Sequence, residues 1–254
     1  RVELGFRQPR SGKIAHVAAC AVALPELSGA LGSLRDTLSK RPPEEGEVRL
    51  LGFKGVVAGS IEPRGKPAMP WGVDAVDVQI SDASLRLPAT AFVQGNAEIA
   101  SRMADALEER ARHHGGSVAV ELFCGAGTFT VPLLKAGYKV WGYDIADDCG
   151  LAFKNATEGF GAAQYHQQDL LGLSPYPEGA PAKPDLVLLD PPRSGAGDVV
   201  GWISASGASC VLMVSCDLAT GLRDAGMLME AGFQCVRINS YDLFPNTGHQ
   251  ELIF

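Results

Sequence analysis

Reactive side chains recur in this 254-residue chain directly after short apolar segments. They are Asp144, Asp190 and Cys216, and Glu251 lies near the C-terminus. A thiol placed just before a helix N-terminus is stabilised as the thiolate, which is its nucleophilic form. A carboxylate nearby can act as a general base. The residue types therefore indicate covalent catalysis with an acid–base partner, provided that the fold brings them together.

Each of these side chains also has a structural interpretation. Cys216 could be buried filler after an apolar strand, Asp190 a turn residue before a proline, and Glu251 a surface acid on an edge strand. His249 could serve as a general base, although a structural role in its loop is the commoner outcome. The catalytic interpretation gains weight because several polar groups, in sequence order, would converge at one edge of one sheet.

A glycine turn supplies a candidate ligand site. The chain alternates β-type residues from Val118, turns through Gly125-Ala126-Gly127 and resumes as an apolar run from Phe129. Such a strand–turn–helix start lets backbone N–H groups approach a ligand at a helix N-terminus. Asp144 follows about 20 residues later, the spacing expected for an acid on ribose hydroxyls. The third glycine of the dinucleotide fingerprint is missing, so the pattern favours a nucleoside cofactor without a pyrophosphate, or a generic β–α turn.

Strands and helices alternate from Val118 onward, which predicts an α/β fold with a doubly wound, mostly parallel sheet. We expect strands at Val118–Phe123, Lys139–Tyr143, Gln164–His166, Leu186–Leu189, Cys210–Val214, Cys235–Ser240 and Leu252–Phe254. We expect helices at Ala97–His113, Thr128–Ala136, Asp147–Gly159, Gly197–Ala205 and Thr220–Ala231. Ligands of such sheets bind at the carboxyl ends of the strands.

Residues 1–90 read as a smaller α+β domain, and residues 91–254 as the catalytic domain. The first part predicts a hairpin over Val2–Val17, an amphipathic helix over Glu26–Lys40, and short strands at Glu47–Leu51, Gly55–Ile61 and Val73–Ile80. It shows no chemistry of its own, and it could contact RNA if the substrate is one.

Composition narrows the class of protein. Residues 1–90 carry 12 basic and 10 acidic side chains, a charge of +2, whereas residues 91–254 carry 10 and 19, a charge of −9. An acidic catalytic half does not resemble a stand-alone nucleic-acid binder. No apolar run is long enough for a membrane span, and the six cysteines show no metal-ligand spacing. We expect a cytoplasmic protein with reduced thiols, no metal, no membrane and no evident stable protein partner.

Five blocks together resemble a known family. They are Phe92-Val-Gln-Gly-Asn96, Glu121-Leu-Phe-Cys-Gly-Ala-Gly127, Leu189-Asp-Pro-Pro-Arg-Ser-Gly195, Val214-Ser-Cys-Asp217 with Ala219-Thr220, and Phe244-Pro-x-Thr-Gly-His-x-Glu251. Their order resembles that of the RNA uracil-5-methyltransferases, S-adenosylmethionine-dependent enzymes that act on tRNA or rRNA. The resemblance runs from about Phe92 to the end, and residues 1–90 resemble the family's central domain more loosely.

The resemblance implies a role for each motif residue. Cys216 would be the nucleophile that attacks C6 of a uridine, and Glu251 the base that removes the C5 proton. Asp190 would lie between cofactor and uracil, with Phe92 beside the flipped base. The residues implied to bind or lie near the cofactor are Gln94, Phe123, Gly125, Gly127, Thr128, Asp144, Asp169 and Asp190.

The sequence also departs from the family pattern. The usual N-terminal OB-type RNA-binding domain and the four-cysteine iron–sulfur motif of some members are absent, so we expect no such cluster in this chain. Gly95 replaces an apolar residue, and Thr128 stands where asparagine is common. Two alternatives remain open: a cofactor-binding RNA-interaction module with little activity alone, and an amino-group methyltransferase, which would place an aromatic residue where Arg193 stands.

Overall fold

The computed structural model describes residues 2–8, 10–146, 149–172, 176–244, 247 and 249–254. The chain forms two compact units, one of Arg1–Val78 with Arg86–Ala91 and one of Gln79–Leu85 with Phe92–Phe254. The tip of one β-hairpin is thus grouped with the second unit. Each unit is described by itself.

Short antiparallel strands and one helix build the first part of the chain. The helix α1 (Pro25–Lys40) begins with a proline, whose missing N–H is no loss in a first turn. It buries Leu34 and Leu38 against Ile61. The strands are β1 (Gly5–Arg7), β2 (Ile14–His16), β3 (Gly46–Phe53), β4 (Val56–Pro63), β5 (Met69–Gly72), β6 (Val76–Ile80) and β7 (Ala83–Leu87). β1 pairs with β2, β6 with β7, and β3, β4 and β5 form one sheet.

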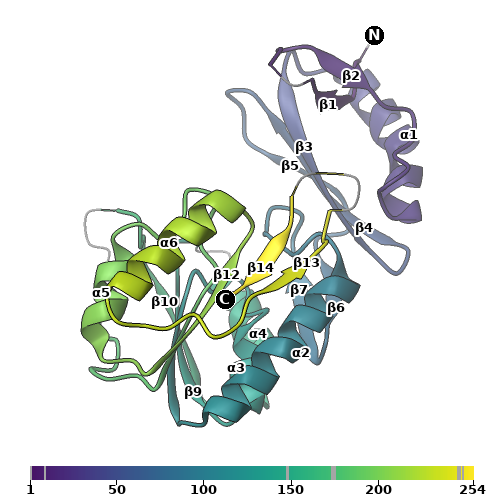
Figure 1. Ribbon diagram of the computed structural model, residues 1–254. Coiled ribbons are helices and arrows are strands. Elements are labelled where there is room, and N and C mark those ends of the chain that lie inside the picture. The colour runs from purple at the N-terminus through teal and green to yellow at the C-terminus, as the bar shows by residue number, and fades with distance from the viewer. Residues whose placement is uncertain (1, 9, 147–148, 173–175, 245–246, 248) are drawn as a thin grey trace. The chain divides into compact units, whose positions relative to one another are not determined.

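The second unit is organised on a sheet of seven strands among the described residues (Figure 1). Their order is β10 (Ala163–Gln167), β9 (Lys139–Asp144), β8 (Val118–Leu122), β11 (Leu186–Leu189), β12 (Cys210–Ser215), β14 (Glu251–Ile253) and β13 (Asn239–Tyr241). The first five run parallel, and β14 is antiparallel to both of its neighbours. The chain enters at β8, moves to one edge and returns to β11. A ligand crevice forms at such a reversal.

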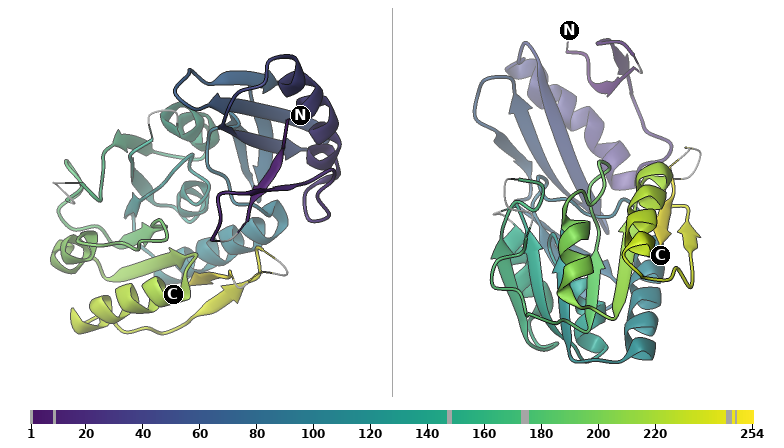
Figure 2. Two further views of the ribbon diagram at one scale, coloured as in Figure 1. Left: turned by 90° about the horizontal axis from the view of Figure 1, so that it is seen from above. Right: turned by 60° about the vertical axis from the view of Figure 1, so that its left-hand side comes forward.

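Helices cover the sheet on both faces. They are α2 (Ala97–His114), α3 (Thr130–Lys135), α4 (Cys149–Thr157), α5 (Val199–Ser206) and α6 (Leu218–Glu230). α3 packs against both α2 and α4, while α5 packs against α6, and the two groups lie on opposite faces (Figures 1 and 2). All four residues of β11 are fully buried. This confirms the doubly wound α/β fold expected from the alternation of the sequence.

Two strands were missed, and two predicted strands have different bounds. β5 and β7 were not predicted: β5 contains a proline and ends in glycine, which masks its strand character. The strand predicted at Cys235–Ser240 is confined to β13, because the described ladder with β14 starts at Asn239. The strand predicted at Val73–Ile80 begins at Val76, and Val73 makes only an isolated bridge to Ala58. In each case pairing with a neighbour, which local propensity does not report, decides the outcome.

Some predictions fall on residues that the structure does not describe. These residues are Asp147, predicted to start α4, and Pro9, Pro245, Asn246 and Gly248 of predicted turns.

The start of α2 is fixed by Asn96. Its side-chain oxygen accepts hydrogen bonds from the N–H groups of Glu98 and Ile99, both at 3.1 Å. These are donors that an uncapped first turn leaves unsatisfied. The asparagine of the Phe-x-Gln-x-Asn block therefore has a structural role in holding the helix that follows Gln94.

Replacing Asn96 by alanine should lower the free energy of unfolding by about 1 kcal/mol, because two helix-end donors lose their acceptor. Urea unfolding followed by circular dichroism measures the change. Asn155→Ala, at an exposed position inside α4, is the matched control and should cost much less. Equal losses in the two variants would contradict the capping role.

Candidate active site

The carboxyl ends of the parallel strands gather the predicted site residues at one edge of the sheet. After β8 come Phe123, Gly125, Gly127 and Thr128, β9 ends at Asp144, Asp169 follows β10, Asp190 follows β11, and Cys216 follows β12. Glu251 opens β14, which runs the opposite way, so its first residue also lies at this edge. The topology therefore brings the strand-end residues into one region.

The glycine turn is bonded directly to the acid at the next strand end. Gly125 N–H donates to Asp144 Oδ2 at 2.9 Å, and Ala146 N–H donates to Oδ1 at 3.0 Å. Phe123, Gly125 and Gly127 all have positive φ values, of 61°, 51° and 88°. Such a φ is unusual for phenylalanine and is typical of backbone held for function. A Cβ on Gly125 would meet no atom within 4 Å, so the turn is open beside Asp144.

Two further carboxyl groups have raised pKa values, those of the half-buried Asp190 and the buried Glu121. Burial is the main cause that raises the pKa of Asp190 to about 8, helped by the charges of Glu251 and Asp144. The buried Gln94 donates to Asp190 Oδ2 at 3.3 Å, which opposes the rise. Burial likewise raises the pKa of Glu121 to about 8, although the Thr130 hydroxyl donates to its carboxylate. Both groups are therefore largely protonated near neutral pH.

Cys216 and Glu251 lie at the same end of the antiparallel ladder of β12 and β14. Ser215 pairs with Leu252 in the antiparallel ladder of β12 and β14, so the next positions along the two strands are Cys216 and Glu251. Glu251 is buried, and its Oε2 has no hydrogen-bond partner among the described residues. A carboxylate with a vacant acceptor thus lies beside a thiol.

The surroundings of Cys216 disfavour its thiolate form. Burial raises the pKa of Cys216, and the charges of Glu251 and Asp190 raise it further. Arg193 opposes both effects, and it also lowers the pKa of Glu251, which burial raises. The helix N-terminus after Cys216, capped by Asp217, was expected to favour the thiolate. Burial and the neighbouring acids act in the opposite direction.

The remaining predicted residues occupy more open positions. Phe92 is 73% exposed and stands two residues before the buried Gln94. Asp169 is exposed, and its Oδ1 accepts the Leu171 N–H at 2.9 Å, which makes a local turn. Thr128 is half-buried. His249 lies edge-on to Phe244, with ring centroids 6.4 Å apart.

The motif analysis missed a role for Asp224. This side chain lies on α6 and is 1% exposed, yet it is charged and bonded to the loop that follows Asp190. The signal available in the sequence was an acidic residue at a position of an amphipathic helix that is otherwise expected to be buried and apolar. Its partners in a distant loop could not be read from the sequence.

The acids in the site predict how stability depends on pH. Glu121 and Asp190 keep their protons to about pH 8 in the folded chain, whereas their ordinary pKa values are 4.5 and 3.8. The folded state then binds more protons than the unfolded state across this interval, so the free energy of unfolding should fall as pH rises from about 4 to about 8.

Glu121→Gln should remove one of these protons and flatten the fall, each proton accounting for up to about 1.4 kcal/mol per pH unit. Unfolding by urea at several pH values measures the slope. Glu98→Gln, on the exposed start of α2, should leave it unchanged. An unaltered slope in Glu121→Gln would show that this carboxyl titrates normally.

Within the described residues, no group of three or more His, Cys, Asp or Glu side chains could hold a metal ion. Nor does the described part of the chain contain a helix with the length and apolar character needed to cross a membrane.

Comparison with known proteins agrees with this architecture. Residues 72–159 match the family described as tRNA (Uracil-5-)-methyltransferase. The chain is 32% identical over 223 residues to the 23S rRNA (uracil(1939)-C(5))-methyltransferase RlmD of Hahella chejuensis, covering 82% of this chain and 50% of that protein. It is 30% identical over 285 residues to the enzyme of the same name from Aeromonas salmonicida, covering 98% of this chain and 64% of that protein.

A solved structure shares the fold over nearly the whole chain. It is the Pyrococcus abyssi tRNA (uracil-54, C5)-methyltransferase in complex with S-adenosyl-L-homocysteine, with a TM-score of 0.72 and 20% identity, covering 99% of this chain and 72% of that one. The fold is thus that of the Rossmann-like S-adenosylmethionine-dependent methyltransferases. The chain spans between half and two thirds of the length of the curated relatives described above. From its sequence blocks, fold and relatives, the chain belongs to the RNA uracil-5-methyltransferase family.

Proposed function

We propose that this chain transfers a methyl group from S-adenosylmethionine to C5 of a uridine in RNA through a covalent bond between Cys216 and C6. The observation that supports the proposal is the register of β12 and β14, whose last pair, Ser215 and Leu252, stands next to Cys216 and the buried Glu251. A thiol and a base on one target ring are what C5 methylation requires. An amino-group methyltransferase needs neither of them.

The chemistry follows from the low nucleophilicity of C5. The thiolate of Cys216 adds to C6, and the electron pair of the C5–C6 double bond moves to form an enolate, which makes C5 nucleophilic. The cofactor, when bound, supplies an electrophilic methyl group on a sulfonium, and C5 takes that methyl group. The Glu251 carboxylate then removes the C5 proton, the S–C6 bond breaks, and the C5–C6 double bond and the thiolate are restored.

Asp190 suits the enolate. Its pKa of about 8 leaves the carboxyl largely protonated near neutral pH, so that it can donate a hydrogen bond to a developing oxyanion. Gln94 fixes one of its oxygens. Phe92, exposed two residues before Gln94, is proposed to pack against the uracil after the base leaves its stack. Such packing offsets part of an unstacking cost of a few kcal/mol.

The residues at the glycine turn fit S-adenosylmethionine. The positive φ of Gly125 and the open space beside it allow close approach to the backbone. Each Asp144 oxygen accepts one N–H bond and retains acceptor capacity for a ribose hydroxyl. A ligand with sulfonium and ammonium charges would favour the ionised forms of Glu121 and Asp190, whose pKa values are raised by burial and by neighbouring acids. Phe123, Gly127, Thr128 and Asp169 are proposed to complete this site.

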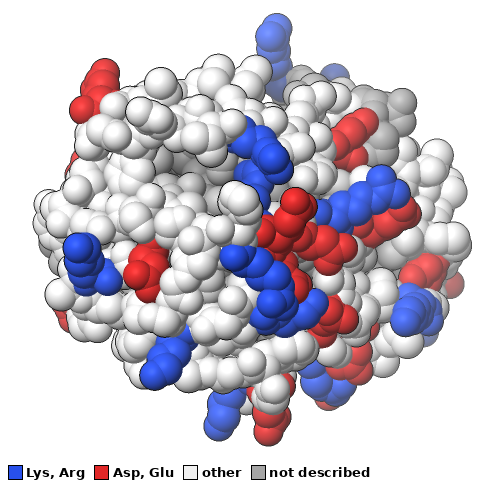
Figure 3. All heavy atoms as spheres, turned by 60° about the horizontal axis from the view of Figure 1, so that its bottom comes forward, with Lys and Arg blue, Asp and Glu red and all other residues white. Residues whose placement is uncertain are grey.

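RNA is the proposed substrate, and the first unit is proposed to help bind it in the cytoplasm. Its arginines Arg7, Arg49 and Arg64 are ion-paired with glutamates, which reduces their attraction for phosphates. On the face in Figure 3, basic and acidic side chains are interspersed over largely uncharged surface. We therefore expect intact cofactor binding but weak RNA affinity for this chain alone.

Product analysis tests the function. The chain is incubated with S-adenosylmethionine carrying a labelled methyl group and with unmodified rRNA or tRNA transcripts, and the RNA is digested to nucleosides. The label should appear in 5-methyluridine. Label on an amino group of another base would overturn the proposal. Cofactor binding by calorimetry without any labelled nucleoside would favour a binding module with little activity.

Glu251→Gln separates the two halves of the mechanism. Addition and methyl transfer should still occur, but the C5 proton stays, so that RNA remains bound to Cys216. Denaturing electrophoresis should show an RNA–protein adduct with ordinary RNA, whereas product release should fall at least about a hundredfold, the scale of general base catalysis. Glu230→Gln, at the end of α6, is the control and should turn over normally. Free methylated RNA at the normal rate from Glu251→Gln would exclude Glu251 as the base.

A further inference from the structure

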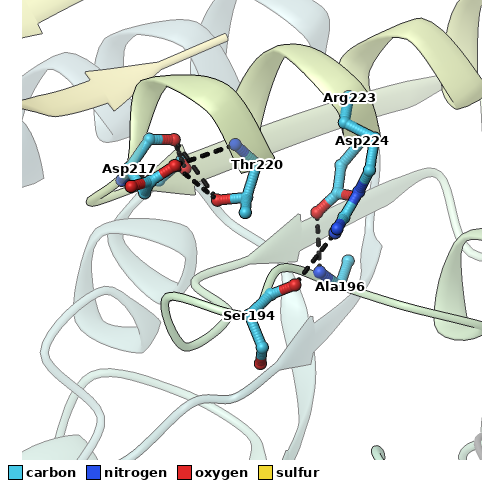
Figure 4. Close-up of polar contacts among 7 residues, drawn as sticks. Ser194, Ala196, Asp217, Thr220, Arg223 and Asp224 are labelled. Carbon is cyan, nitrogen blue, oxygen red and sulfur yellow. Dashed lines mark hydrogen bonds and ion pairs between the residues drawn. The ribbon is translucent and has the colours of Figure 1, made fainter.

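Arg223 and Asp224, an ion pair on α6 of which only Asp224 is buried, are hydrogen-bonded to the loop that follows Asp190 (Figure 4). The carboxylate of Asp224 is 1% exposed. Its Oδ2 accepts the Ala196 N–H at 2.6 Å, and its Oδ1 accepts Nε and Nη2 of Arg223 at 2.9 and 2.7 Å. Arg223 Nη2 also donates to the Ser194 carbonyl at 3.0 Å. Two adjacent residues of one helix thus hold two backbone groups of the loop.

The loop passes so close to this pair that glycine is required between the two anchor points. Gly195 has a φ of 90°, which favours glycine. A Cβ there would collide with the Arg223 guanidinium and lie 2.6 Å from Asp224 Oδ2. The Gly195 N–H closes a turn onto the Pro192 carbonyl at 2.8 Å. The segment from Pro192 to Ala196 is therefore a tight turn held against α6.

The same helix also fixes the chain beside Cys216. Asp217 caps α6 by accepting the Thr220 N–H at 2.9 Å, and Ser215 Oγ donates to the Asp217 carbonyl at 2.9 Å. Figure 4 shows the cap and the Asp224 cluster along one helix. The helix therefore sets where the Cys216 segment lies relative to the turn that carries Arg193.

We propose that Arg223 and Asp224 are positioning residues that hold Arg193 close to Cys216 and Glu251. Three charged or titratable groups act on Cys216 from the surrounding elements: Asp190, Glu251 and Arg193. Of these Arg193 alone is cationic. Its side chain is exposed, so its place depends on the backbone turn beneath it. The inference rests on the proposed function only for the statement that Cys216 is the nucleophile.

Asp224→Asn is the direct test. Ala196 and Arg223 donate to different oxygens of Asp224, so the single amide oxygen of asparagine can replace only one of them, and the amide NH₂ would face the other donor. The readout is the rate at which iodoacetamide alkylates Cys216, followed by mass spectrometry of its peptide from neutral to alkaline pH. We expect the rate near neutral pH to fall roughly threefold, as for a pKa shift of about half a unit.

A double-mutant cycle with Arg193→Gln identifies the route of the effect. Arg193→Gln should slow alkylation in the same direction, and adding Asp224→Asn to it should change nothing more, since the residue to be positioned is gone. Arg223→Gln can replace Asp224→Asn in the cycle. The Arg223 side chain is half exposed, so its removal is less disruptive to folding. Glu108→Gln, another ion-paired acid on α2, is the matched control and should keep the normal profile.

Normal alkylation in both Asp224→Asn and Arg223→Gln, or an equal slowing with and without Arg193, would overturn the inference. The readout needs neither RNA nor cofactor. A failure of the proposed methyl transfer can therefore be told apart. In that case the product analysis finds no 5-methyluridine, while the double-mutant cycle of alkylation rates gives the expected result.

Discussion

The chemistry of the second unit depends on carboxyl groups that lie close together at one edge of its mostly parallel sheet. Glu121, Asp144, Asp190 and Glu251 come from four strand ends or starts that the topology forces together. Burial and mutual repulsion raise the pKa values of Glu121 and Asp190 to about 8. This arrangement is costly for the folded chain. It becomes favourable for a ligand that carries positive charge, or for chemistry that needs a neutral acid beside a base.

The acids also oppose ionisation of the thiol on which the proposed reaction depends. Burial, Glu251 and Asp190 all raise the pKa of Cys216, and Arg193 is the counterweight among the named groups. The position of Arg193 therefore matters to the site although its side chain touches solvent. The ion pair of Arg223 and Asp224 explains how an exposed loop residue can be kept in place: two backbone groups of its turn are bonded to a helix.

Much of the fold could be predicted from the sequence, because buried parallel strands such as Leu186–Leu189 and the spacing of glycine turn and acid report on local structure. The clustering of Asp144, Asp190 and Cys216 could also be predicted, because a parallel sheet brings the carboxyl ends of its strands to one edge. What could not be predicted depends on contacts between distant segments. The proximity of Cys216 and Glu251 depends on the register of β14 against β12. The hydrogen bonds of Asp224 depend on the position of the loop at Ala196, and the extent of β13 depends on its pairing with β14.

The central claim is that Cys216 forms a bond to C6 of a uridine during methylation. The chain is incubated with S-adenosylmethionine and RNA in which 5-fluorouracil replaces uracil, and then analysed by denaturing electrophoresis. Fluorine at C5 cannot leave as a proton, so the reaction should stop as an RNA–protein adduct that is absent from Cys216→Ala and present in a control variant such as Cys235→Ala. An adduct that persists in Cys216→Ala, or methylated fluorouracil RNA released without any adduct, would contradict the account.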